Sequence, residues 1–122
     1  MTVYRFEEMA WHAPVAPGTD DAEAEEAARQ GARRRFLTQG DGGFYAQVVD
    51  LPPNFATPAH SHSHAEVFMV LEGSCTLNGE QLGAYDMTVI PAEDVYGFTA
   101  GPEGLRFLVV RTGPASYAAS KG

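Results

Sequence analysis

The sequence predicts an all-β domain, either a sandwich or a barrel. Short apolar runs alternate with turn signals along the chain, and its 13 glycines and 8 prolines are spread out rather than gathered in a tail. With 122 residues, the chain is expected to form one domain, spanning residues 1–122. The predicted strands, in order, are Val3–Phe6, Arg35–Thr38, Phe44–Leu51, Val67–Leu71, Ser74–Leu77, Met87–Ile90, Tyr96–Ala100 and Leu105–Thr112.

Turn residues separate these predicted strands. Gly40–Gly43 is typical of a hairpin turn between the second and third strands, and Asn78-Gly79 of another tight turn. Pro52 and Pro53 end the third strand, because proline has no amide hydrogen to donate to a neighbouring strand. Gly101–Gly104 predicts the turn before the last strand.

One segment, Asp20–Arg35, breaks the β pattern. It is rich in Ala, Glu and Arg, with acidic residues first and basic residues last, which suits the dipole of a helix. Its apolar positions are almost all alanine, so such a helix has little to bury. We expect a short N-terminal helical insert, either a solvated segment or a lid over a pocket.

The charge balance excludes several partners. Eight Lys and Arg residues against sixteen Asp and Glu residues give a net charge of −8, which repels phosphate backbones and anionic lipids. We therefore expect no nucleic acid and no membrane as a partner. No apolar run approaches a membrane span, the first residues do not resemble a secretory signal, and Cys75 is the single cysteine. A cytoplasmic location follows as an expectation, with Cys75 a small buried residue.

Three of the four histidines lie close together, at positions 60, 62 and 64, and a glutamate follows at position 66. Alternate residues of a strand point to the same face, so these four side chains could converge. Imidazole nitrogen and carboxylate oxygen suit Fe(II), Mn(II), Ni(II) or Zn(II). The pattern therefore predicts a site for one divalent transition metal ion.

This segment resembles the first metal motif of the cupin superfamily. His60-x-His62, then three residues, Glu66, then six residues and Gly73 match that motif, spacing included. The resemblance extends over about residues 51–110. It implies a double-stranded β-helix, the jelly-roll barrel of cupins, with His60, His62 and Glu66 as ligands of a metal inside it.

The second cupin motif is present in altered form. Tyr85-Asp86 and Pro91 stand where that motif begins, but Tyr96 occupies the place of its histidine ligand. Without that histidine, two imidazoles and one carboxylate remain, the donor set of non-haem Fe(II) oxygenases. Tyr96 could ligate the metal, bind a substrate or act as a general acid, and His64 is a spare donor that could move a proton.

Three functions follow as hypotheses. We favour an Fe(II)-type dioxygenase acting on a small organic molecule, with Mn(II), Ni(II) or Zn(II) as other candidate ions. The second hypothesis is a metal-dependent lyase, isomerase or cyclase in which Tyr96 or His64 moves the proton. The third is a non-catalytic cupin that binds or senses a small ligand.

Two further features bear on partners. Arg33-Arg34-Arg35 forms either a solvated helix end or a cationic lip for a carboxylated substrate. The predicted strand Val67–Leu71 is apolar on both faces, which suits burial against a second sheet or a second subunit. We therefore expect a homodimer.

Overall fold

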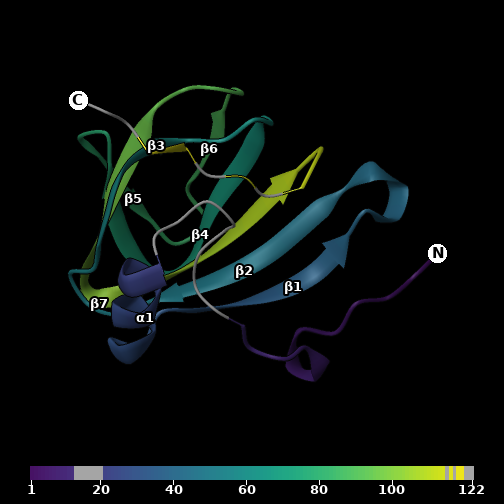
Figure 1. Ribbon diagram of the computed structural model, residues 1–122, viewed down its shortest axis with the longest axis horizontal. Helices are drawn as coiled ribbons and strands as arrows, with labels where there is room; N and C mark the ends of the chain where they lie inside the picture. The colour runs from purple at the N-terminus through teal and green to yellow at the C-terminus, as the bar shows by residue number, and fades with distance from the viewer. Residues whose placement is uncertain (13–20, 115, 117, 120–122) are drawn as a thin grey trace.

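A computed structural model describes residues 1–12, 21–114, 116, 118 and 119. Figure 1 shows strands that curl around a common interior, with helix α1 beside one end of the sheet. The helical elements are η1 (Phe6–Glu8), α1 (Asp21–Arg29) and η2 (Asp41–Gly43). The strands are β1 (Arg33–Gln39), β2 (Tyr45–Leu51), β3 (Ala56–Ser61), β4 (Glu66–Leu77), β5 (Glu80–Gly83), β6 (Met87–Ile90), β7 (Tyr96–Arg111) and β8 (Ala118–Ala119).

Two long strands organise the sheet, and all pairings between the described strands are antiparallel. β7 pairs with β2, β3 and β4, whereas β4 pairs with β5, β6 and β7. Because both strands exchange partners along their length, the sheet folds back on itself. The prediction of an all-β fold is confirmed.

The core follows the two-residue period of the strands. Phe68 and Val70 on β4 and Phe107 and Val109 on β7 are buried. Phe68 stacks on Phe107 with 4.5 Å between ring centroids. Each inward row then ends on a charged residue, Glu66 in β4 and Arg111 in β7, so the sequence period that builds the core also carries these charges inside.

The structure corrects the prediction at the N-terminus. Val3–Phe6 is not a strand, and Val3 is 63% exposed. Phe6, at the end of this segment, instead packs edge-on against Trp11, with 5.8 Å between ring centroids. The ring centroid of Trp11 lies 3.8 Å from the guanidinium carbon of Arg33 and 4.0 Å from that of Arg35. The helix is also shorter than predicted, because Gly31 adopts φ +104° two residues after Arg29 and the chain turns into β1. Its predicted start at Asp20 lies outside the described residues.

The arginine cluster therefore belongs to a strand, not to a helix end. Arg33 and Arg35 point to the face that carries Trp11, while Arg34 points inward and is buried. β3 and β5 were not predicted, because both segments are poor in apolar residues. Cys75 is buried as expected. The outward-facing residues of β4 are half-buried, and Val89 on the neighbouring strand β6 is exposed. A second subunit that covers this face has not been tested, so the homodimer stays a prediction.

Candidate functional site

A cavity of about 640 Å³ lies inside the barrel. Its wall is largely apolar, with Val49, Leu51, Phe98 and Phe107 among the lining residues. Helix α1 closes part of it through Ala22, Glu26 and Ala27, together with Gln30 directly after the helix. The helical insert thus forms part of the cavity wall, and Ala27 is the residue that it buries. A cavity of this size and lining accommodates a small organic molecule.

His60 and His62 both line this cavity and are held by backbone carbonyl groups. Nδ1 of His60 donates to the carbonyl oxygen of Pro58 at 2.9 Å, and Nδ1 of His62 donates to that of Ser116. Because a carbonyl oxygen can only accept, both rings carry their proton on Nδ1 and leave Nε2 as a lone-pair donor. This is the arrangement that orients metal-binding histidines.

Both imidazoles are kept neutral by their surroundings. Burial lowers the pKa of His60, and burial together with the charge of Arg111 lowers the pKa of His62 to about 4. Only a neutral imidazole can bind a metal ion. The histidine pair is therefore in its metal-binding form at neutral pH.

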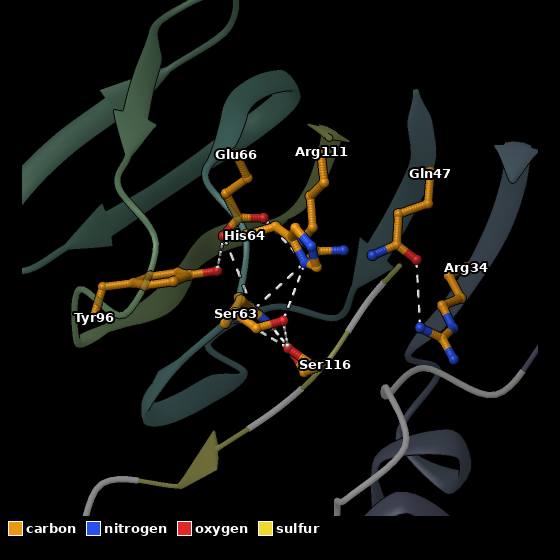
Figure 2. Close-up of polar contacts among 9 residues, drawn as sticks. Arg34, Gln47, Ser63, His64, Glu66, Tyr96, Arg111 and Ser116 are labelled. Carbon is orange, nitrogen blue, oxygen red and sulfur yellow. Dashed lines mark hydrogen bonds and ion pairs between the residues drawn. The ribbon is translucent and has the colours of Figure 1, made fainter. Parts of the chain in front are cut away.

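Glu66 lies behind these histidines with its carboxylate fully buried. The hydroxyl of Tyr96 donates to Oε1 of Glu66, and Nη2 of Arg111 lies 3.0 Å from Oε2 (Figure 2). The same Nη2 lies 3.4 Å from Nε2 of His62. Burial and the neighbouring Glu66 carboxylate raise the pKa of Tyr96, so its phenol stays protonated. The buried carboxylate is thereby balanced by one cation and one hydroxyl donor.

These contacts test how well the residues fit a metal ion. Two Nε2 atoms on one wall suit a divalent transition metal. Oε1 of Glu66, however, already accepts a hydrogen bond from Tyr96, and Oε2 forms an ion pair with Arg111 at 3.0 Å. Over the described part of the chain, no three His, Cys, Asp or Glu side chains are placed to hold one ion. The two imidazoles are donors of the kind that a transition metal prefers, but Nε2 of His62 already faces Nη2 of Arg111, and Glu66 is engaged by Tyr96 and Arg111.

The alternating residues at positions 60, 62, 64 and 66 do not lie on one strand, although the sequence pattern suggested that they do. β3 ends at Ser61 and β4 begins at Glu66, so residues 62–65 form the connection between them. His64 lies in that connection, contacts the hydroxyl of Ser63 at 3.0 Å and is not part of the cavity lining. Tyr96 is opposite His60 in the pairing of β3 with β7 and lines the cavity. His12 bridges to Arg34 through its backbone.

Three further polar residues of the cavity were missed by sequence reasoning or left undecided. The sequence predicts no role for Arg111 or Gln47. It places Arg34 in the cluster Arg33-Arg34-Arg35 without separating the inward-facing arginine from the other two. All three line the cavity, and all are buried. The alternation along β7 was a usable signal for Arg111, since residues 105, 107 and 109 are apolar and inward-facing. No comparable apolar row precedes Arg34.

Comparison with known proteins agrees with this architecture. A family model described as a cupin domain matches residues 47–111, more than half of the chain. The chain therefore belongs to the cupin family, and the predicted double-stranded β-helix is confirmed. A search of curated proteins found no match. None of the described helices is long and apolar enough to cross a membrane.

Several solved structures are similar. The polyketide cyclase RemF from Streptomyces resistomycificus has a TM-score of 0.73 and 25% identity, over 98% of this chain and 84% of that one. KdgF from Halomonas sp. has a TM-score of 0.68 and 20% identity, over 93% and 96% of the two chains. A dioxygenase candidate from Nostoc punctiforme has a TM-score of 0.65 and 28% identity, over 74% of this chain and 33% of the other.

Acidification is expected to destabilise the metal-free protein. His60 and His62 have lowered pKa values in the folded state, whereas an unfolded histidine titrates near 6.5. Between the two values the unfolded chain binds more protons, so the free energy of unfolding falls by about 1.4 kcal/mol per pH unit for each histidine as the pH drops below about 6.5. For His62 this loss continues to about pH 4.

Urea unfolding in a chelator at pH 7.5, 6.0 and 5.0 measures this effect. His62→Gln cannot titrate and should show a shallower decline than the wild type. Identical pH profiles for the two proteins would contradict the assignment of His62 as a buried neutral histidine.

Proposed function

We propose that this cupin is an enzyme that moves a proton on a small organic molecule bound in the barrel, in a reaction of the cyclase, lyase or isomerase class. The observation that carries the proposal is the Tyr96–Glu66–Arg111 chain at the inner end of the cavity. Tyr96 lines the cavity, whereas Glu66 is behind it. Among the described residues, Tyr96 is the cavity-lining side chain that donates a hydrogen bond to the Glu66 carboxylate, so it can connect a bound substrate to that carboxylate.

This order of groups suits a proton relay. The hydroxyl oxygen of Tyr96 accepts a proton from the substrate while its own proton passes to Oε1 of Glu66, so the phenol is neutral before and after. The raised pKa of Tyr96 fits this role, because no tyrosinate has to accumulate. Glu66 becomes a neutral acid, and the Arg111 cation is then left to stabilise the negative charge on the substrate. Return of the proton to another substrate atom completes an isomerisation or ring closure.

A bound metal would add to this chemistry on the histidine side. His60 and His62 would hold a divalent transition metal ion, which polarises a substrate oxygen as a Lewis acid. Fe(II) was favoured from the sequence, and Mn(II), Ni(II) and Zn(II) suit the same imidazole donors. The proton relay through Tyr96 and Glu66 does not depend on which of these ions is bound.

Two observations favour proton transfer over the oxygenase predicted from the sequence. An oxygenase triad needs the Glu66 carboxylate as a ligand, and both its oxygens are engaged by Tyr96 and Arg111. The RemF structure, similar over nearly the whole chain, is that of a polyketide cyclase. Cyclisation of a chain of ketones begins with proton loss next to a carbonyl group, which is the step that the Tyr96 relay performs.

Tyr96→Phe is expected to slow proton exchange by a factor of about 100 or more, the usual contribution of a positioned acid or base. The free energy of unfolding should fall by only about 1–3 kcal/mol, because the ring stays in place and one hydrogen bond to Glu66 is lost. The measurement is deuterium incorporation next to the carbonyl group of 1-tetralone in D₂O, without oxygen, with the Zn(II)-loaded protein, because a simple ketone exchanges slowly without a catalyst at neutral pH.

The same assay separates the competing hypotheses. His64→Gln should exchange as fast as the wild type, because His64 is not part of the cavity lining. Oxygen consumption by the Fe(II)-loaded protein, without any deuterium exchange, would restore the dioxygenase hypothesis. Binding of 1-tetralone without either reaction would favour the non-catalytic ligand-binding cupin.

A further inference from the structure

We infer that Arg111 competes with the divalent metal ion for Glu66, and so withholds from the ion the carboxylate of the cupin metal motif. The inference rests on the proposed function for the position of the ion beside His60 and His62. The wild-type chain would bind the ion weakly, through imidazole nitrogens. Removal of Arg111 would free Glu66 as a third ligand and increase the metal affinity.

The three residues of the first cupin motif lie close together in the folded chain. The ring centroids of His60 and His62 are 4.8 Å apart, and Nε2 of His62 lies 3.9 Å from Oε1 of Glu66. Two ligand atoms that bind one transition metal ion are roughly 3–3.5 Å apart, since each is about 2 Å from the ion. A small adjustment of these side chains would therefore bring them to one ion, and distance alone does not keep Glu66 away from it.

One nitrogen of Arg111 contacts two of these motif side chains. Its Nη2 lies 3.0 Å from Oε2 of Glu66 and 3.4 Å from Nε2 of His62, and Figure 2 shows the guanidinium group beside Glu66. A metal ion bound by both side chains would need the space that this nitrogen occupies. The positive charge of the guanidinium would also repel the ion, most strongly in a buried site where water does not screen the charges. Arg111 and an ion bound by Glu66 therefore exclude each other.

The register of the sheet holds Arg111 in this position. Glu66 on β4 is directly opposite Arg111 on β7 in the pairing of the two strands. The two side chains are 0% and 6% exposed. Separating a buried ion pair leaves an uncompensated charge inside the protein, which is costly. A metal ion must meet this cost before Glu66 can bind it, so the competition is built into the pairing of β4 with β7.

Oxygen Oε2 of Glu66 is the atom that removal of Arg111 would make available. It is buried, and among the described residues it has the ion pair with Arg111 but no hydrogen bond. The other oxygen, Oε1, would keep the hydrogen bond from Tyr96. Oε2 would then be a charged oxygen near two imidazoles, which is a donor set that transition metals prefer. A divalent ion there would also replace the positive charge lost with the guanidinium.

The test is a calorimetric titration of Co(II) into the whole chain, purified without a histidine tag and freed of metal with a chelator. Arg111→Met is expected to bind Co(II) about 10-fold or more tightly than the wild type, because it gains a carboxylate ligand and loses a repelling charge. Glu66→Gln/Arg111→Met should bind less tightly than Arg111→Met, but no less tightly than the wild type. Arg106→Met is the matched control and should bind like the wild type, because Arg106 lies on the same strand but pairs with Asp50.

A second measurement applies if Arg111→Met does not fold without metal. Co(II) should then restore its folded circular dichroism spectrum, because a ligand that binds the folded state stabilises it. If the variant stays unfolded in Co(II), the comparison of Glu66→Gln/Arg111→Met with the wild type decides.

Two results would overturn the inference. One is equal Co(II) affinity in Arg111→Met and the wild type. The other is a loss of about 10-fold or more in Glu66→Gln/Arg111→Met relative to the wild type, which would mean that Glu66 is already a metal ligand while Arg111 is present. No substrate is used, so this result is separate from that of the proton relay.

Discussion

Arg111→Met is expected to lower the free energy of unfolding by about 3–5 kcal/mol, the cost of leaving a buried charge without its partner. The side chain of Glu66 is fully buried, and Arg111 is the cation beside it, with Nη2 at 3.0 Å from Oε2. Without Arg111, the neutral hydroxyl of Tyr96 is the one remaining hydrogen-bond donor to the carboxylate among the residues that the structure describes. Glu66 must then either stay charged in an apolar interior or take up a proton, and both cost stability.

A double substitution distinguishes an unpaired charge from lost packing. Glu66→Gln/Arg111→Met removes both charges and should be more stable than Arg111→Met alone. Urea unfolding at pH 7 provides the comparison. If the double variant is as unstable as the single one, the cost comes from the volume of the arginine side chain and not from its charge.

Arg106→Met is the matched control for Arg111→Met. Arg106 lies on the same strand, and its Nε is 2.6 Å from Oδ1 of Asp50, but its side chain is 25% exposed. Water can therefore replace the lost partner, and the expected cost is about 1 kcal/mol or less. Equal losses for Arg106→Met and Arg111→Met would mean that burial of the ion pair does not determine its contribution to stability.

Gly73→Ala is expected to cost more than about 3 kcal/mol, or to prevent folding. Gly73 adopts φ +75°, where a side chain is strained. A Cβ at this position would overlap the carbonyl oxygen of Gly104 and lie 2.9 Å from its carbonyl carbon. Since the obstacle is the backbone of β7, it cannot move without breaking the pairing of β4 with β7.

Gly79→Ala separates the overlap from the backbone strain. Gly79 has φ +85°, but a Cβ there would have no atom within 4 Å. Its expected cost is therefore only the strain of a left-handed residue, about 1–2 kcal/mol. Thermal unfolding of the two variants measures the difference. Equal losses of stability in the two variants would mean that the close approach of Gly104 is not the reason why position 73 requires glycine.

The surroundings of Gly73 also explain its place in the first cupin motif. From the sequence, Gly73 was part of a pattern associated with metal binding. In the structure it allows β4 and β7 to approach each other where their register shifts. Its role is therefore in packing, while His60 and His62 of the same motif line the cavity.

Several strand boundaries predicted from the sequence were wrong for the same reason. One predicted strand ended at Leu71 and the next began at Ser74, and Tyr96–Ala100 was divided from Leu105–Thr112. In the structure β4 and β7 each run through these glycines without a break. Glycine permits a bulge as well as a turn, and only the neighbouring strand decides which one forms. β3 contains Pro58 and few apolar residues, so its pairing with β7 was not evident from its own sequence.

Local periodicity and motif spacing determined the fold class, the inward row of β4 and the pair His60 and His62. These features arise within a few residues of one another, where the strand period governs which side chains share a face. The partners of Glu66 were decided by the tertiary structure alone. Tyr96 and Arg111 are at opposite ends of β7, and both reach Glu66 because β7 changes its pairing partners along its length. The period of a strand sets the side to which each residue points, but the closure of the barrel sets which ends meet.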